Sequence, residues 1–228
     1  MSNQVFGLPR VGTMVSAEYR HVLANMSGAQ YLPGSKKVID ASLSRDPLNT
    51  GYLSVLRAGL LLGKITASGL YAPSILGVTT GAYTAGGTSL SASAATVTEL
   101  VRRVGATGTF TLIGPPTAAG AVAQQAVTYS AASGTTITIT ALGADAIAGS
   151  FIAPDDGSQW PKTIIGDGYG INVTDENSTD WDTEVARLLI AGTVDQAQII
   201  NYPSDTSLIA WLKNQLKQDG KFQFLSDF

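Results

Sequence analysis

The sequence has no cysteine and only one histidine, His21, among its 228 residues. Without cysteine the chain has no disulfide, no zinc–thiolate site and no thiol nucleophile. No second histidine is available to complete a catalytic triad elsewhere, and no G-x-S-x-G nucleophile elbow is present. We expect His21, which lies beside Tyr19 and Arg20, to be a surface or interface residue rather than a general base.

Charge is also scarce. Charged residues make up 14% of the chain, against a usual value of about 25%. The net charge is −3, and basic residues never exceed two in a row, as at Lys36-Lys37 and Arg102-Arg103. A nucleic-acid interface needs a basic patch that neutralises phosphates, so we expect no nucleic-acid partner. A surface of low charge is typical of a protein that other protein largely covers.

Long apolar runs are missing as well. The longest, such as Leu60–Leu62, are far shorter than the ~18 residues of a membrane span. The opening residues "MSNQVFGLPRVG" lack the charged start and apolar run of a secretory signal. We therefore expect no membrane association, and a soluble protein that is made and kept in a cytoplasm.

Residues 79–150 differ in composition from both flanks. These 72 positions hold four charged residues, whereas the other 156 hold 27. Ala, Gly, Thr and Ser are concentrated in the same segment. A change at both ends predicts an inserted domain, with residues 41–78 and 151–228 forming the core around it. The alternative is one low-charge sheet that belongs to a single domain.

The segment 79–150 contains helix and strand patterns. "TVTELVRRV" has apolar residues at helical spacing, with Thr96 and Glu99 as a capping box and Gly105 as the stop. Arg102 and Arg103 suit the C-terminal end of that helix dipole. "TGTFTLIG", "VAQQAVTYSA" and "GTTITITAL" then predict three strands. The segment is therefore expected to be a small α+β domain with one helix on a sheet.

The flanking regions predict a mainly β structure. Residues 1–40 show no sustained period and are expected to form an extended arm, with a short helix across 16–26 as the alternative for part of it. Strands are expected in 52–76, with a hairpin turn at Ala67-Ser68-Gly69, and around glycine bends in 163–173 and 185–194. A helix is expected to begin at Pro203-Ser204 and to end at Gly220, with "KFQFL" as a last short strand. Its apolar face comprises Leu208, Trp211, Leu212 and Leu216.

The glycine-rich "GDGYG" at 166–170 does not fit a phosphate-binding loop. Ile171 breaks the G-x-G-x-x-G pattern, no helix pattern follows, and no Gly-Lys-Ser/Thr is present. A tight bend that needs positive φ explains these glycines better.

Acidic residues gather at 154–158 and 174–184. Asp175, Asn177 and Thr179 resemble alternate positions of a calcium loop, but Asp180 stands where that loop needs glycine. The second cluster offers carboxylates to a glycosidase, although no spacing selects a pair; they are Asp175, Asp180, Asp182 and Glu184. A solvated loop is the simpler interpretation, and we expect no enzyme activity, cofactor or metal.

Two separate stretches resemble one protein family. "LRAGLLLGKITASGLYAPS" (56–74) is similar to the opening strands of the lambda-type head decoration, or capsid cement, proteins of tailed bacteriophages, with Leu70 in place of the more usual lysine. "DDGSQWPKTIIGDGYGINVTD" (155–175) and "EVARLLIAGTVDQAQI" (184–199) resemble later passages of the same family. The resemblance covers 52–78 and about 153–228, and it does not cover 79–150.

The resemblance implies a fold and a structural role. It implies a compact, β-barrel-like decoration core with a C-terminal helix, to which composition adds the inserted α+β domain and the extended N-terminal arm. It also implies a homotrimer on the outside of the virion, assembled in the host cytoplasm, that binds the major capsid protein of an expanded shell and bridges its subunits. The arm would then contact the capsid by adding to an exposed strand edge; the candidate residues are Val5, Phe6, Leu8, Pro9, Arg10, Val11 and Val15.

Two other functions stay open at this point. The chain is alternatively another virion component, such as a head fibre, tail or baseplate protein, whose insert binds a receptor or a glycan. The third hypothesis is a hydrolase that uses the carboxylates of 174–184.

Overall fold

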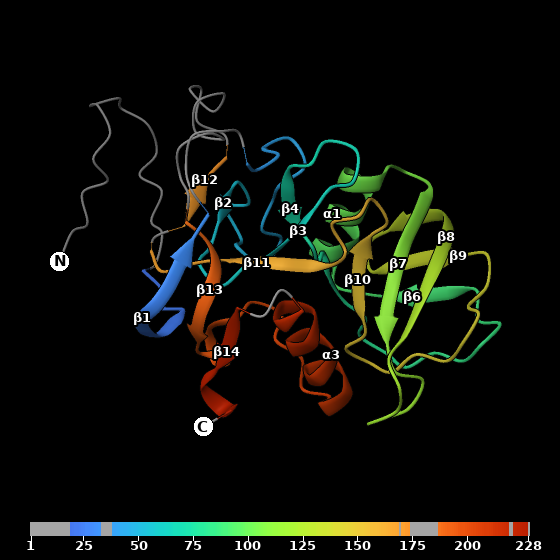
Figure 1. The fold of residues 1–228 in the computed structure, drawn as a ribbon. Coiled ribbons are helices and arrows are strands. Elements are labelled where there is room, and N and C mark those ends of the chain that lie inside the picture. Colours follow the sequence, from blue (N-terminus) through green and yellow to red (C-terminus); the bar gives the residue numbers. More distant parts are fainter. Residues whose placement is uncertain (1–18, 33–37, 169, 174–186, 219–220, 228) are drawn as a thin grey trace.

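The chain folds into a mainly β structure (Figure 1). The computed structural model describes residues 19–32, 38–168, 170–173, 187–218 and 221–227. Within these ranges the strands form two six-stranded sheets and one small pair, β2 (Val55–Leu56) with β12 (Ile171–Asn172). The mainly β class expected from the sequence is confirmed.

The first sheet contains the hairpin expected from the sequence. Its strand order is β1-β13-β11-β3-β4, and β14 pairs in parallel with β13. The bounds are β1 Leu23–Tyr31, β3 Leu61–Lys64, β4 Tyr71–Pro73, β11 Pro161–Ile165, β13 Leu188–Val194 and β14 Phe222–Phe224. Strands β3 and β4 pair antiparallel, and Gly69 at φ +73° lies just after the turn between them. Both hairpin strands and the turn are confirmed.

The second sheet curls strongly. Its order is β5-β10-β7-β8-β9-β6, with bounds β5 Gly77–Val78, β6 Ser89–Ser91, β7 Gly108–Gly114, β8 Ala123–Ser133, β9 Thr136–Ile139 and β10 Phe151–Pro154. A bridge between Thr79 and Ala92, just beyond β5 and β6, joins the two ends of this order. The segment 79–150 thus builds most of this sheet, and β5 and β10 at its two ends pair with each other.

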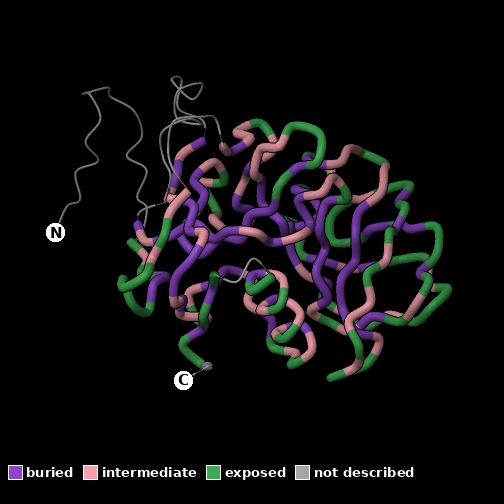
Figure 2. The backbone as a smooth tube through the Cα atoms, in the orientation of Figure 1, coloured by how far each residue is buried: buried purple, intermediate pink, exposed green. Residues whose placement is uncertain are grey.

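Two hydrophobic clusters fill the interior, and strand β10 contributes to both. Phe151 and Ala153 belong to the cluster of the first sheet, whereas Ile152 belongs to that of the second. Successive side chains of a strand point to opposite faces, so β10 is buried on both. Figure 2 shows that the buried backbone is concentrated in the middle of the molecule.

The three strands expected in 79–150 are confirmed as β7, β8 and β9, and the helix is confirmed as α1 (Ala94–Val104). The expected capping box is wrong. The helix begins three residues earlier, with Ser93 as the N-cap whose side chain accepts a hydrogen bond from the Thr96 amide. Thr96 is itself buried against Gly77, so packing rather than capping explains this threonine. Gly105, at φ +124°, ends the helix as expected.

The helix considered for 16–26 does not form over its described part. Residues from Leu23 onward lie in β1, which pairs antiparallel with β13 from Leu23 to Tyr31 with several irregularities. This part of the expected arm is therefore a sheet strand. The sequence does not show it, because Gly28, at φ +78°, interrupts the alternation of apolar and polar residues that identifies a strand. Residues 1–18 lie outside the described residues.

The C-terminal helix is α3 (Thr206–Lys217), and its N-cap is Asp205 rather than Pro203 or Ser204. Its expected apolar face is confirmed, because Leu208, Leu212 and Leu216 are buried in the first cluster. Strand β14 confirms the short final strand predicted for "KFQFL". Gly220, expected to end the helix, lies outside the described residues.

Candidate interaction groove at the hairpin

The hairpin β3–β4 interlocks with the loop that leads from β10 to β11. A Cβ atom on Gly63 would lie 1.9 Å from the backbone oxygen of Ser158 and 2.6 Å from that of Trp160. On the other side, a Cβ atom on Gly157 would lie 2.1 Å from Thr66 Oγ1. The Thr66 amide also donates a hydrogen bond to the backbone oxygen of Asp156 at 2.9 Å. The two stretches that carry the family resemblance therefore meet in one close backbone contact.

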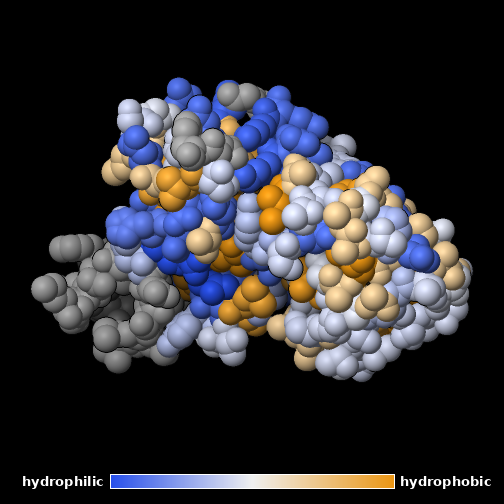
Figure 3. All heavy atoms as spheres, turned by 90° about the horizontal axis from the view of Figure 1, so that it is seen from below, coloured by the Kyte–Doolittle hydropathy of each residue, from blue (hydrophilic) through white to orange (hydrophobic). Residues whose placement is uncertain are grey.

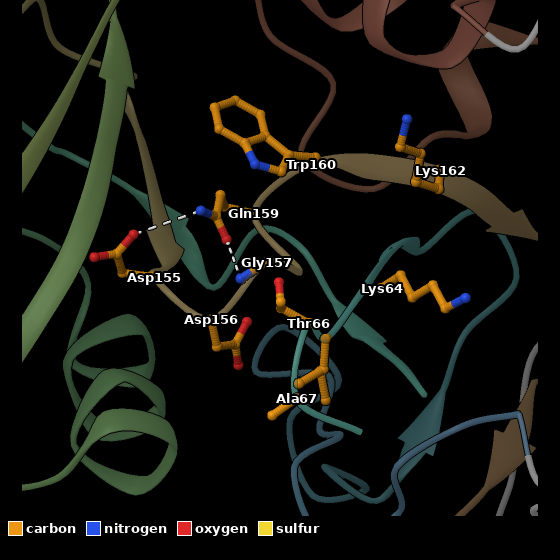
Figure 4. A pocket seen from close by; sticks show the side chains of 10 residues that line it. Lys64, Thr66, Ala67, Asp155, Asp156, Gly157, Gln159, Trp160 and Lys162 are labelled. Atoms are coloured by element: carbon orange, nitrogen blue, oxygen red, sulfur yellow. Dashed lines mark hydrogen bonds between the residues drawn. The ribbon is translucent and has the colours of Figure 1, made fainter. Parts of the chain in front are cut away.

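A groove of about 630 Å³ lies where these two segments meet (Figure 4). We call it the hairpin groove, and its lining residues are Lys64, Ile65, Thr66, Ala67, Asp155, Asp156, Gly157, Gln159, Trp160 and Lys162. In the close-up, Trp160 lies at one end, Lys64 and Lys162 lie toward the other, and these two lysine side chains extend in different directions. Lys64 ends β3, and Lys162 lies in the neighbouring strand β11 at an irregularity in the pairing of the two strands.

The acidic side chains of the groove are engaged within the protein. Asp155 accepts hydrogen bonds from Thr111 Oγ1 at 3.1 Å and, at 3.5 Å, from Gln159 Nε2. The Gln159 side chain in turn accepts a hydrogen bond from the Gly157 amide at 2.6 Å and so stabilises the conformation of the loop. Asp156 accepts from both the amide and the hydroxyl of Ser158.

Helix α1 reaches the same loop through Arg103. This guanidinium, whose side chain is 1% exposed, donates to Asp156 Oδ2 at 2.8 Å and to Ser158 Oγ at 2.9 Å. It also donates a hydrogen bond to the backbone oxygen of Leu43. Arg103 therefore joins α1 to the loop between β10 and β11 and to the segment between β1 and β2.

Arg102 makes a second connection beside the first. It donates to the oxygens of Ser42 at 2.8 Å and Leu43 at 3.0 Å, and it pairs with the buried Glu99. We call Arg102 and Arg103, with their partners in 42–43 and 156–158, the arginine clasp. Three of the four charges of 79–150 thus lie at the clasp, and the fourth, Asp145, accepts from the Ala85 amide.

The clasp lowers the pKa of Asp156. Partial burial raises that pKa, but the hydrogen bonds from the Ser158 side chain and amide, together with the charge and hydrogen bond of Arg103, outweigh it. The carboxylate is therefore held ionised at neutral pH.

This lowered pKa predicts a specific acid sensitivity. A carboxyl group whose pKa is depressed by folding stabilises the fold above its unfolded pKa, about 3.9, and this contribution is lost as the pH falls through the folded pKa. We expect Asp156→Asn to be less stable than the wild type near neutral pH, and the two to converge in acid. Urea unfolding from about pH 6 down to about pH 2.5 measures the gap; a gap that stays constant contradicts the assignment.

Aromatic packing fixes the Trp160 end of the groove. The Trp160 ring lies 6.4 Å from that of Trp211 on α3, and Trp211 lies 6.0 Å from Phe151 on β10. These tilted contacts are within the range of favourable aromatic pairs. A chain of three rings therefore connects the groove to α3 and to β10 of the second sheet.

The sequence-predicted sites fall largely outside the described residues. All seven arm candidates, from Val5 to Val15, lie in 1–18, and the carboxylates of 174–184 lie in the undescribed range 174–186. His21 is exposed, as expected, and its Nδ1 lies 3.4 Å from Asp167 Oδ2. The "GDGYG" glycines serve as the expected bend, with Gly168 at φ +147° and Gly170 at φ +90°.

Sequence reasoning missed the hairpin groove and the arginine clasp. It assigned Arg102 and Arg103 to the helix dipole, whereas their side chains bind loops about 60 residues away in sequence. The available signal was the rarity of charge in 79–150, which made two adjacent arginines there exceptional.

Comparison with protein-family models, curated proteins and solved structures finds no match to this chain. Among the described residues, no group of three or more His, Asp or Glu side chains is placed to hold a metal ion. No helix in those same ranges is long and apolar enough to cross a membrane.

Proposed function

We propose that the chain is a virion structural protein that binds the outside of an expanded phage capsid as a trimer and bridges neighbouring capsid subunits. One observation supports this more than any other: the stretches that resemble decoration proteins, far apart in sequence, are neighbours in a single sheet. Strands β3 and β4 come from the stretch before residue 79, and β11 and β13 come from the stretch after residue 150. The segment without resemblance makes most of the other sheet.

The proposal assigns a role to each part. The first sheet with α3 and β14 is the decoration core, and 79–150 is an inserted domain carried on it. The residues before β1 form the capsid-binding arm, which adds to a strand edge of the capsid protein through Val5, Phe6, Leu8, Val11 and Val15. Three arms on one trimer act together, so weak single contacts give firm binding.

The test is direct. Purified protein mixed with expanded phage shells that lack decoration protein is expected to bind in a fixed ratio and to raise the temperature at which the shells break. Light scattering on the free protein is expected to show a trimer, or a monomer that trimerises only on the shell. A deletion of residues 2–15 is the matched variant, and we expect it to keep the fold and to lose shell binding. Shells that bind no protein and stay equally heat-sensitive would refute the proposal.

A specific observation favours the second candidate, a virion component whose insert binds a receptor or glycan. The exposed residues of the second sheet are almost all Ala, Gly, Ser, Thr and Gln, and this part of the surface is pale in Figure 3, whereas much of the first sheet's side is blue. The hydroxyl and amide side chains of this surface can donate and accept the hydrogen bonds that a glycan makes. Detection of the protein in isolated tails rather than heads would favour this candidate.

A further inference from the structure

Strand β1 is an open edge of the first sheet. It ends the strand order of that sheet, and among the described strands it pairs with β13 alone (Figure 1). The opposite edge is covered, because residues 38–40 exchange backbone hydrogen bonds with Tyr71 of β4. The two ends of the second sheet's order are joined by the bridge between Thr79 and Ala92. With nine residues, β1 is the longest strand that ends a sheet in the described part of the chain.

The residues of β1 do little to prevent a further strand from pairing with it. Proteins commonly protect an open edge with charged side chains or proline. The stretch "LANMSGAQY" has neither, and six of its nine residues are exposed, including Met26 at 72%. Its irregular pairing with β13 bends the strand and gives partial protection. The outer side of β1 can therefore accept an added strand through main-chain hydrogen bonds.

The residues that precede β1 have the composition of such a strand. Apolar side chains recur from Val5 to Val15. An extended chain between these two residues spans about 33 Å, which is enough to lie along all of β1. The added arm would be the new edge of the sheet, and there Pro9 and Arg10 supply the protection that β1 lacks.

The start of β1 favours an arm from another copy over the chain's own arm. Arg20 exchanges two backbone hydrogen bonds with Gly168, at 3.0 and 3.1 Å. The amides of Val22 and Leu23 donate to Asp167 Oδ1 at 2.6 and 2.8 Å. Because these bonds hold residues 20–23 against the bend at 167–168, they do not form the tight turn that a hairpin with β1 requires. An arm from a neighbouring copy needs no such turn.

We propose that, in the free trimer, the arm of each protomer adds to strand β1 of the next protomer. Each copy then gives one arm and receives one, and such a head-to-tail contact closes into a ring. The number of copies rests on the function proposed above, whereas the contact rests on the β1 edge. On the shell, the arm leaves β1 for the strand edge of the capsid protein.

Introduced cysteines test this contact, because the chain has none of its own. Phe6→Cys in the arm is combined with Gln30→Cys at an exposed residue of β1, and the free full-length protein is treated with a short bismaleimide. We expect covalent dimers and trimers on a denaturing gel. The matched control combines Phe6→Cys with Thr138→Cys, which is exposed on β9 of the other sheet, and it is expected to stay monomeric on the gel.

Light scattering tests the same contact without a crosslink. Deletion of residues 2–15 is expected to give a folded monomer at concentrations at which the wild type is a trimer. Ala24→Lys combined with Gln30→Lys places two charges on exposed positions of the edge and leaves the arm intact. We expect this variant to lose the trimer as well, because charged side chains on an edge oppose pairing.

The outcomes separate the exchange of arms from the proposed function. Interchain products that need both cysteines, together with loss of the trimer in the deletion and lysine variants, support the exchange. It is overturned if the crosslinks form only within one chain, if the Thr138 control crosslinks equally, if the wild type is a monomer in solution, or if the deletion variant stays a trimer. Failure of the wild type to bind shells, with the interchain products still formed, refutes the capsid function and keeps the exchange.

Discussion

Replacement of Gly63 by alanine is expected to destabilise the fold by about 3 kcal/mol or more, the range reached when backbone is forced apart in a packed core. The added Cβ atom would meet two backbone oxygens, those of Ser158 and Trp160, at 1.9 and 2.6 Å. Neither oxygen belongs to a flexible side chain, so the hairpin and the loop must separate. Urea unfolding measures the loss, and the hairpin groove is expected to open with it.

Two further variants, Gly69→Ala in the hairpin and Gly143→Ala between β9 and β10, separate steric clash from backbone strain. Gly69→Ala has open space, with Lys64 Cε at 3.6 Å, but it must keep φ at +73°, and we expect a loss of about 1 kcal/mol. Gly143→Ala meets only Gln125 Oε1 at 3.5 Å without a positive φ, so its effect should stay within about 0.5 kcal/mol. A Gly63→Ala protein as stable as Gly143→Ala would show that the interlock is absent.

Replacement of Arg103 by methionine is expected to cost about 3 kcal/mol. Removing one partner of a buried ion pair costs about 3–5 kcal/mol, and the lower end applies because the Asp156 side chain is 31% exposed. The loss includes the hydrogen bonds to Ser158 and to the Leu43 oxygen. Hydrogen exchange in α1 and in the 156–158 loop is expected to rise together, since both elements lose the same connection.

A double-mutant cycle tests the cause of that loss. Arg103→Met combined with Asp156→Asn is expected to cost clearly less than the sum of the single variants, because the double variant leaves no unpaired charge. Lys221→Met removes an exposed positive charge elsewhere and should change stability by no more than about 0.5 kcal/mol. Additive single losses would assign Arg103 a packing role instead of an ionic one.

Elements with a strong local pattern were predictable from the sequence. Strands β7 and β9 are rich in β-branched residues, β8 alternates apolar and polar side chains from Val127 to Ser130, and α3 repeats leucine every four residues, so local patterns alone locate them. Helix α1 was also located, but its start was not. Ser93 and Thr96 are both good N-cap residues, and only the tertiary contact of Thr96 with Gly77 decides between them.

The groove and the clasp were beyond prediction for a different reason. Both depend on pairs of residues distant in sequence, such as Arg103 with Asp156 and Gly63 with Ser158. Helix polarity accounts equally well for an arginine at that position, so local reasoning had no cause to search for a partner. Strand β1 was missed because its pairing with β13 is irregular, which removes the period of two that identifies a strand.

Strand β10 has a mechanical consequence. Its backbone is hydrogen-bonded into the second sheet, through Phe151 with Ile113 and through Ile152 with Leu112, whereas the side chains of Phe151 and Ala153 are embedded in the other core. A force applied to the second sheet is therefore transmitted to the first through a buried strand and through the arginine clasp, rather than through a flexible linker. An object attached to one sheet would transmit torque as well as tension to whatever holds the other.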